Sequence, residues 1–112
     1  MKPKAGWGKS EESRKMLQPY KDKGLTYQGA VRAWLADYKL KRGCTDCGFN
    51  RHPAALELDH EGEKSIEIAK ARTSIDRLLE EIEKGECVVR CSNCHAIKTA
   101  ERRQNGKDEI AA

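Results

Sequence analysis

Four cysteines in two Cys-x-x-Cys pairs are the residues of this chain whose type and spacing point most directly to chemistry. The pairs are Cys44/Cys47 and Cys91/Cys94, and 43 residues separate them. A two-residue spacing lets both thiolates of a pair reach one tetrahedral ion, and four thiolates complete a closed zinc site. Because such a site has no open coordination position, we expect this Zn²⁺ to be structural. A pair of redox dithiols is the weaker alternative, since the chain lacks a thioredoxin-like βαβ pattern.

Asp59, His60 and His95 are the residues that could carry out a hydrolysis of phosphodiester bonds. Such a reaction near neutral pH needs a base that activates water and a cation that stabilises charge on the phosphate. Histidine suits the first task, and a carboxylate with an imidazole can hold Mg²⁺ or Mn²⁺ with open positions. His95 directly follows the zinc ligand Cys94, so the zinc site would also fix where His95 points. Taken singly, each residue has a structural alternative, such as a turn cap or an ordinary helix histidine.

The first elements that must position these residues are a helix and a strand. Apolar residues at helical spacing predict a helix of roughly four turns from Tyr27, with Thr26 as its N-cap and Gly43 past its end. Residues 55–60 alternate apolar and polar side chains, which predicts a half-buried strand. The strand ends in Asp59 and His60, and these two side chains would diverge unless the strand ends or bends there.

The second half of the chain predicts a helix, a strand and a last helix. The apolar positions of the first of these helices are Ile75, Leu78, Leu79 and Ile82. Its acidic residues, which we expect to be solvated, are Glu80, Glu81 and Glu83. This helix ends at Gly85, and a β-branched strand follows over residues 87–90, in which Cys87 is expected to be an inert buried thiol. The last helix begins near Ser92 and runs to about Arg103, and residues after Gln104 are expected to fray.

Basic residues are concentrated near the start of the chain. Residues 1–43 carry eleven Lys and Arg against four Asp and Glu, whereas residues 44–112 carry eleven against fourteen. This asymmetry suggests an arm that follows a polyanion such as nucleic acid, but a solubilising tail fits the charge equally well. The arm includes a short helix predicted around residues 11–17. Residues that would give it salt-sensitive affinity are Lys2, Lys4, Lys9, Arg14 and Lys15, and Trp7 would anchor it by packing or stacking.

Composition limits the class of protein. No apolar run approaches the roughly 18 residues of a membrane helix, and the first residues lack the hydrophobic region of a signal peptide. We therefore expect a cytoplasmic protein with no membrane partner, in which cysteines stay reduced and bind metal. Only 38% of the residues are apolar, so a single modest domain of this length has a thin core and needs a further stabilising element such as a structural metal site.

The residues around the cysteine pairs resemble the HNH endonucleases of the ββα-metal superfamily. The likeness spans residues 44 to about 103, over half the chain. It runs through Cys44-x-x-Cys47, Leu56-Glu57-Leu58-Asp59-His60, Leu78-Leu79-Glu80-Glu81-Ile82-Glu83-Lys84 and Cys91-Ser92-Asn93-Cys94-His95-Ala96-Ile97-Lys98-Thr99. The cysteine and Asp-His placement is also similar to recombination endonuclease VII-type enzymes. The resemblance implies an α+β fold: a small ββα-metal core with a β-hairpin and helices, stapled by the four-cysteine zinc and preceded by a basic helical segment.

The resemblance also implies roles for single residues. In such enzymes the Asp at the strand end and a residue of the final helix bind the catalytic metal, and the His after the Asp is the general base. Carried over, Asp59 and His95 look like ligands of Mg²⁺ or Mn²⁺, and His60 looks like the base. The family has a middle Asn that orients the base or helps at the metal. Here Asn93 lies inside a cysteine pair, and the counterpart positions hold Glu67 or Glu86.

The last helix adds a basic stripe. Lys98, Arg102 and Arg103 follow His95 at i+3, i+7 and i+8, so they would contact the DNA backbone, with a solvated helix face as the alternative.

The sequence therefore predicts a metal-dependent endonuclease that nicks DNA as a monomer or weak homodimer, because one site per chain cuts one strand. Its expected parts are a basic arm (1–25), a zinc-stapled domain (26–104) and a flexible tail (105–112). The alternative is a non-catalytic zinc-containing DNA-binding or adaptor protein on the same scaffold, which the missing Asn favours. The resemblance also implies a phage or mobile-element source.

Overall fold

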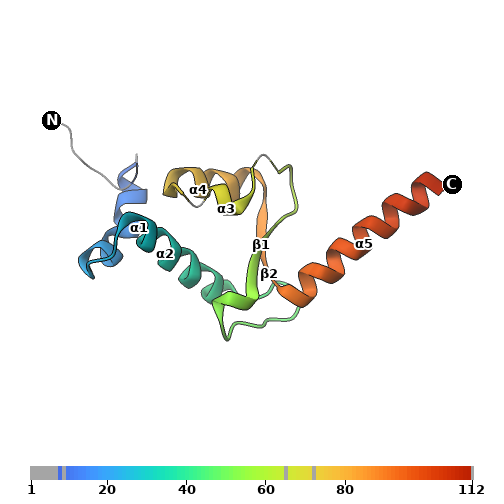
Figure 1. Cartoon of the computed structure of the whole chain (residues 1–112), viewed down its shortest axis with the longest axis horizontal. Helices are drawn as coiled ribbons and strands as arrows, with labels where there is room; N and C mark the ends of the chain where they lie inside the picture. Colours follow the sequence, from blue (N-terminus) through green and yellow to red (C-terminus); the bar gives the residue numbers. More distant parts are fainter. Residues whose placement is uncertain (1–7, 9, 65, 72, 112) are drawn as a thin grey trace.

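The computed structural model describes residues 8, 10–64, 66–71 and 73–111, without the side chains of residues 69 and 105–111. Its elements are α1 (Glu11–Asp22), α2 (Tyr27–Arg42), the short 3₁₀ helix η1 (Pro53–Ala55), β1 (Leu56–His60), α3 (Ile68–Ala71), α4 (Ile75–Lys84), β2 (Cys87–Cys91) and α5 (Ser92–Ala111). The chain is thus a small α+β fold, as predicted (Figure 1). Four residues of the predicted arm, Lys2, Lys4, Trp7 and Lys9, lie outside the described residues.

The two N-terminal helices begin at polar caps. Thr26 starts α2 as predicted, because its side chain accepts a hydrogen bond from the Gly29 N–H. Gly43 ends α2 with a φ of +68°, a backbone conformation that glycine adopts at little cost. The first helix is longer than predicted: Ser10 and Ser13 form a reciprocal cap, and the helix continues through Pro19 to its end.

The sheet consists of β1 and β2 in an antiparallel pair, with α3 and α4 inserted between the two strands. Leu56 lies opposite Cys91 and His60 opposite Cys87. Because side chains alternate along a strand, Leu56 and Leu58 turn to one face of the sheet and Glu57 and Asp59 to the other. The first face belongs to the core, and the second carries most of the candidate site.

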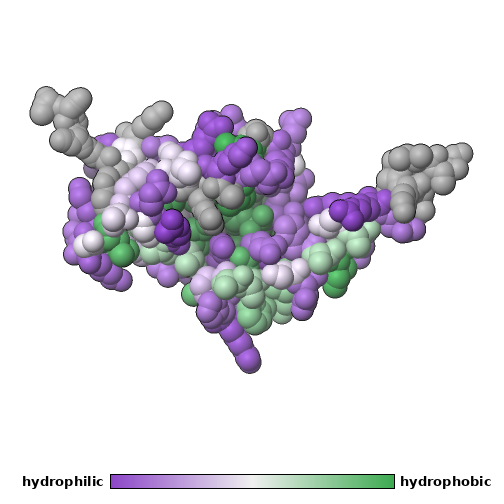
Figure 2. Space-filling model, viewed as in Figure 1, coloured by the Kyte–Doolittle hydropathy of each residue, from purple (hydrophilic) through white to green (hydrophobic). Residues whose placement is uncertain are grey.

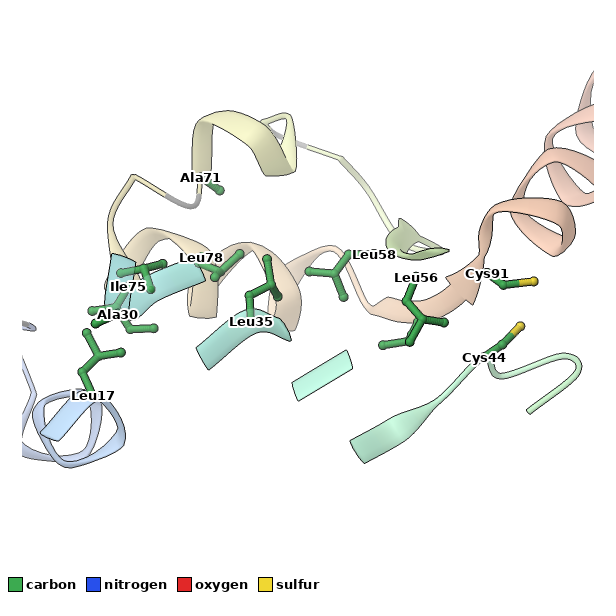
Figure 3. Packing of buried hydrophobic residues seen from close by; sticks show 12 residues of the cluster. Leu17, Ala30, Leu35, Cys44, Leu56, Leu58, Ala71, Ile75, Leu78 and Cys91 are labelled. Carbon is green, nitrogen blue, oxygen red and sulfur yellow. The ribbon is translucent and has the colours of Figure 1, made fainter. Parts of the chain in front are cut away.

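The core is a single row of buried apolar side chains. Figure 3 shows it running from Leu17 of α1, past Leu35 of α2 and Leu78 of α4, to Leu56 of β1. Cys44 and Cys91 lie at the end of this row, and both are buried. The cysteine cluster therefore closes one end of a thin core.

The last helix leaves the body of the fold. Its first turns pack against β1 and β2, and Figure 1 shows the rest of α5 projecting away from the other elements. It continues to Ala111 instead of ending near Arg103, and Ile97 on it is 57% exposed. In the view of Figure 2 the surface is mostly hydrophilic. No helix within the described ranges is long and apolar enough to cross a membrane.

Candidate functional site

Cys44, Cys47, Cys91 and Cys94 form one cluster beside the end of the sheet. Their sulfur atoms all lie within 4.8 Å of one another, and the Sγ atoms of Cys47 and Cys91 are 3.7 Å apart. Four sulfurs bound to one tetrahedral Zn²⁺ at about 2.3 Å lie about 3.8 Å apart. The cluster could therefore hold a structural metal ion such as zinc. In the part of the chain that the structure describes, no other group of three or more His, Cys, Asp or Glu is placed to hold a metal ion.

Backbone N–H groups donate to the sulfur atoms of this cluster and thereby favour the ionised thiolates that bind a cation. The N–H of Cys47 donates to Cys44 Sγ, and the N–H of Cys94 donates to Cys91 Sγ, both at 3.4 Å. Burial raises the pKa of the Cys44 thiol, but the N–H groups of Cys91, Cys47 and Asp46 outweigh burial and lower this pKa to about 6. The neighbouring thiol of Cys91 raises the pKa of Cys94 to about 12. Cys44 is thus ionised at neutral pH, whereas Cys94 must lose its proton when metal binds.

Zinc affinity is expected to fall at least about 100-fold for each unit of acidification between pH 8 and 6. The Phe49 N–H lowers the pKa of Cys47, but hydrogen bonds with neighbouring thiols outweigh it and raise this pKa above its ordinary value. Cys47 and Cys94 therefore each release a proton on binding throughout this range, and acid works against that release. Competition with a metallochromic chelator at pH 6, 7 and 8 measures the slope. A slope clearly below 100-fold per unit would contradict the assignment of both thiols as ligands.

Asp59 on β1 and His95 in the first turn of α5 face each other. His95 Nε2 lies 3.3 Å from Asp59 Oδ1, and Asp59 is 4% exposed. On its other side the His95 ring contacts Glu57, through Nδ1 and Oε1. A carboxylate at Nδ1 keeps the proton there and leaves the Nε2 lone pair for a metal. Neighbouring ligands of an octahedral ion are about 3 Å apart, so Asp59 Oδ1 and His95 Nε2 fit as two ligands of one divalent ion.

His60 lies on the opposite side of β1 from Asp59 and is held by α4. Its Nε2 is 2.8 Å from Oε2 of Glu81, which is 2% exposed. An ionised Glu81 carboxylate only accepts hydrogen bonds, so opposite it a neutral His60 ring would carry its proton on Nε2 and keep Nδ1 as the basic nitrogen. A Cβ at Gly85 would lie 2.6 Å from His60 Cδ2, so the ring packs directly on the backbone there. Glu81 and Gly85 together fix the ring.

Glu81 corrects one sequence-based expectation. We expected Glu80, Glu81 and Glu83 to form a solvated face, but Glu81 is buried. Leu78 precedes Glu81 by three residues, which places both side chains on the core-facing side of α4. That spacing was a usable signal. The carboxylate that pairs with His60 comes from this position, whereas the sequence pointed to Glu67 or Glu86.

Two arginines neutralise Asp59. Arg90 Nη1 donates to Asp59 Oδ2 at 2.7 Å, and Arg102 donates to Oδ1 at 3.2 Å and to Oδ2 at 3.3 Å. Burial raises the pKa of Asp59, but the hydrogen bonds from Arg102 and Arg90 outweigh it and hold this pKa below its usual range. Asp59 is therefore ionised at neutral pH, which a metal ligand requires. Arg90 was not identified from the sequence.

A pocket of about 410 Å³ brings the candidate catalytic residues together. It is lined by Leu58, Asp59, His60, Gly62, Lys64, Glu67, Ile68, His95 and Arg102. Asp59 and His60 reach the same pocket because β1 ends at His60 and the chain turns at Gly62. The pocket therefore combines a base, two possible metal ligands and two cationic side chains.

The other predicted residues lie in different surroundings. Lys98 Nζ is 3.9 Å from Glu101, and Arg103 lines a neighbouring pocket that Glu57 and His95 also border. Glu67 lines the main pocket and pairs with Lys64 at 2.8 Å. Glu86 lies in the turn before β2 with a φ of +50°. Of the three basic residues predicted on the last helix, Arg102 is the one that lines the main pocket.

Cys87 lies outside the cysteine cluster. Its thiol donates to the Glu81 carbonyl at 3.6 Å, and burial raises its pKa to about 11. Cys87 is partly buried and therefore stays protonated at neutral pH.

Comparison of the chain with protein-family models, with curated proteins and with solved structures finds no match.

Proposed function

We propose that the protein is a metal-dependent, HNH-type endonuclease that nicks DNA. The observation that carries this proposal is the shared pocket of Asp59, His60 and His95, in which two metal-ligand atoms lie 3.3 Å apart and the His60 ring is held through its Nε2 by Glu81. The burial of Asp59 and Glu81 supports it, because two buried carboxylates that each face a histidine are rarely needed for packing alone.

His60 acts as the general base. Its Nδ1 takes a proton from a water molecule, the water oxygen attacks the scissile phosphorus, and the bond from phosphorus to the leaving oxygen breaks. The negative charge of Glu81 stabilises the imidazolium that results and keeps the ring oriented. The leaving oxygen takes its proton from solvent through the open side of the pocket.

Asp59 and His95 would hold the divalent ion, Mg²⁺ or Mn²⁺. When bound, this ion supplies stabilisation of the charge that develops on the phosphate and the leaving oxygen. Glu57 holds His95 in the tautomer that can ligate, and the arginines keep Asp59 charged. The cysteine cluster acts at a distance, by fixing the start of α5 and thus the place of His95.

The basic residues fit a polyanionic substrate. Lys64 and Arg102 line the pocket, and Arg103 lies beside it on α5. Contacts of this kind position a phosphate backbone without reading its sequence. Binding is then strongly salt-dependent and needs no base-specific contact.

A non-catalytic DNA-binding protein is the second candidate. The observation that favours it is the pair of guanidinium groups on Asp59, since Arg90 and Arg102 contact both of its oxygens. An ion at Asp59 would have to compete with Arg102, and a chain that has lost turnover would keep this arrangement.

A plasmid assay separates the two candidates. Zinc-loaded protein is incubated with supercoiled DNA in Mg²⁺, in Mn²⁺ and in EDTA, and the open-circular product is measured. The endonuclease produces nicks with a divalent ion and none in EDTA. If DNA shifts on a gel and zinc is retained, yet no nick appears with either ion, the non-catalytic candidate replaces the proposal.

A further inference from the structure

Arg90 is a buried cation at the centre of the fold. Its side chain is 5% exposed, and its three nitrogens each contact a different carboxylate at 2.7 Å. Nε contacts Asp46, Nη1 contacts Asp59 and Nη2 contacts Glu61. A buried guanidinium is stable only when it is paired in this way, and its planar shape fixes the directions of its partners.

The three carboxylates belong to different parts of the molecule. Asp46 lies between the ligands Cys44 and Cys47, inside the first cysteine pair. Asp59 is the candidate metal ligand on β1. Glu61 belongs to the turn that follows β1. Arg90 itself precedes Cys91, so it is tied to both cysteine pairs: through its backbone to the second and through Asp46 to the first.

We propose that Arg90 is a positioning residue that couples the cysteine cluster to Asp59 and so to the site of the divalent ion. The chain of contacts runs from the first cysteine pair through Asp46 and Arg90 to Asp59 Oδ2, while Asp59 Oδ1 lies 3.3 Å from His95 and 3.2 Å from Arg102. The proposal rests on the proposed function in one respect: it assigns a divalent ion to Asp59 and His95.

Through this coupling, zinc affects the position of Asp59 as well as the stability of the fold. When zinc holds the first cysteine pair, Asp46 is fixed and Arg90 has one position in which all three pairs are made. If Asp46 moves, Arg90 loses the contact that ties it to the first cysteine pair, and its position beside Asp59 is no longer set by that pair. The order of the zinc site thereby sets the affinity of a second metal site that shares none of its ligands.

Asp46 and Glu61 offer a matched pair of variants. Their side chains are 39% and 40% exposed, and each makes one 2.7 Å contact with Arg90. Asp46→Ala removes the link to the cysteine pair, whereas Glu61→Ala removes an equal contact and keeps that link. Neither residue is a zinc ligand or a catalytic residue, and neither is buried, so both variants are expected to fold and to keep zinc.

Mn²⁺ binding to zinc-loaded protein is measured by electron paramagnetic resonance, without DNA. Asp46→Ala is expected to weaken the Mn²⁺ affinity by about tenfold, the lower end of the effect of removing an outer-shell partner. Glu61→Ala is expected to change it less than about threefold, because the link from Asp46 through Arg90 to Asp59 remains. Equal Mn²⁺ affinities of the two variants would overturn the coupling, even if both differ from the parent.

A second measurement separates this inference from the proposed function. The side-chain NMR signals of His95 and Asp59 are recorded for the parent and both variants, without divalent ion. If the parent binds no Mn²⁺, the proposed function fails, yet signals that move in Asp46→Ala and stay in place in Glu61→Ala still support Arg90 as the coupling residue. Signals that stay in place in both variants, or move equally in both, would overturn it.

Discussion

His60→Ala is expected to lower the rate of plasmid nicking by about 10²- to 10⁴-fold, the range that a general base contributes. The reason is that His60 lines the same pocket as the candidate metal ligands and, with its Nε2 hydrogen-bonded to Glu81, has Nδ1 as its basic nitrogen. Initial rates with supercoiled plasmid at saturating Mn²⁺ measure the effect. The affinity for DNA and the zinc content are expected to stay unchanged, because His60 is neither one of the basic residues of α5 nor one of the four clustered cysteines.

Two further variants distinguish the loss of the general base from a loss of stability. His60→Ala removes one of the hydrogen-bond partners of the buried Glu81, which costs about 1–3 kcal/mol of stability. His60→Gln keeps a donor that can reach Glu81 but has no basic nitrogen, so it should be as slow as His60→Ala with a smaller loss of stability. His52→Ala removes an exposed histidine whose Nδ1 accepts from the Ala54 N–H, and it should cut at the parental rate. Nicking by His60→Gln at the parental rate would remove His60 from the mechanism.

The sequence predicted those parts of the fold that local rules determine. Thr26 and Gly43 bracket α2 where capping chemistry places the ends of a helix, and the alternation of Leu56, Glu57 and Leu58 gives the strand. The cysteine pairs are equally local, since a two-residue spacing prepares two thiolates for one ion. Each of these signals lies within a few residues of the feature that it predicts.

The missed residues depend on partners far away in the chain. Arg90 pairs with Asp46 and Asp59, which are 44 and 31 residues distant, and nothing in the short strand around it marks a buried cation. Glu81 pairs with His60, 21 residues away. A charged residue next to apolar positions is usually solvated, so only the folded arrangement identifies the exceptions.

The end of the last helix was also misjudged, for a different reason. Residues after Gln104 were expected to fray, but α5 continues through Gly106 to Ala111. Arg102 and Arg103 are good helix formers, and no proline interrupts the helix after them, so a single glycine costs only about 1 kcal/mol. The extra length of α5 has little effect on the site, because His95 and Arg102 lie in the first three turns of this helix.

Removal of zinc is expected to unfold the domain. A structural zinc ion contributes about 10–16 kcal/mol in small zinc-dependent folds, whereas small domains have a total stability of only about 5–15 kcal/mol. Cys44 and Cys91 end the apolar row of Figure 3, so without the ion their thiols leave that end of the core unsupported. Circular dichroism and amide NMR spectra in excess chelator, and of Cys91→Ser, should both show loss of the folded state.

Cys87→Ser is the matched control, because it alters a cysteine that lies outside the cluster. Its hydroxyl can replace the thiol as donor to the Glu81 carbonyl, so zinc content and folding should be retained. If the chelated protein and Cys91→Ser keep native spectra, the core is sufficient by itself and the cysteines act only locally. If both unfold while Cys87→Ser does not, the four-cysteine site is the element on which the fold depends, and the positions of Asp59 and His95 depend on it in turn.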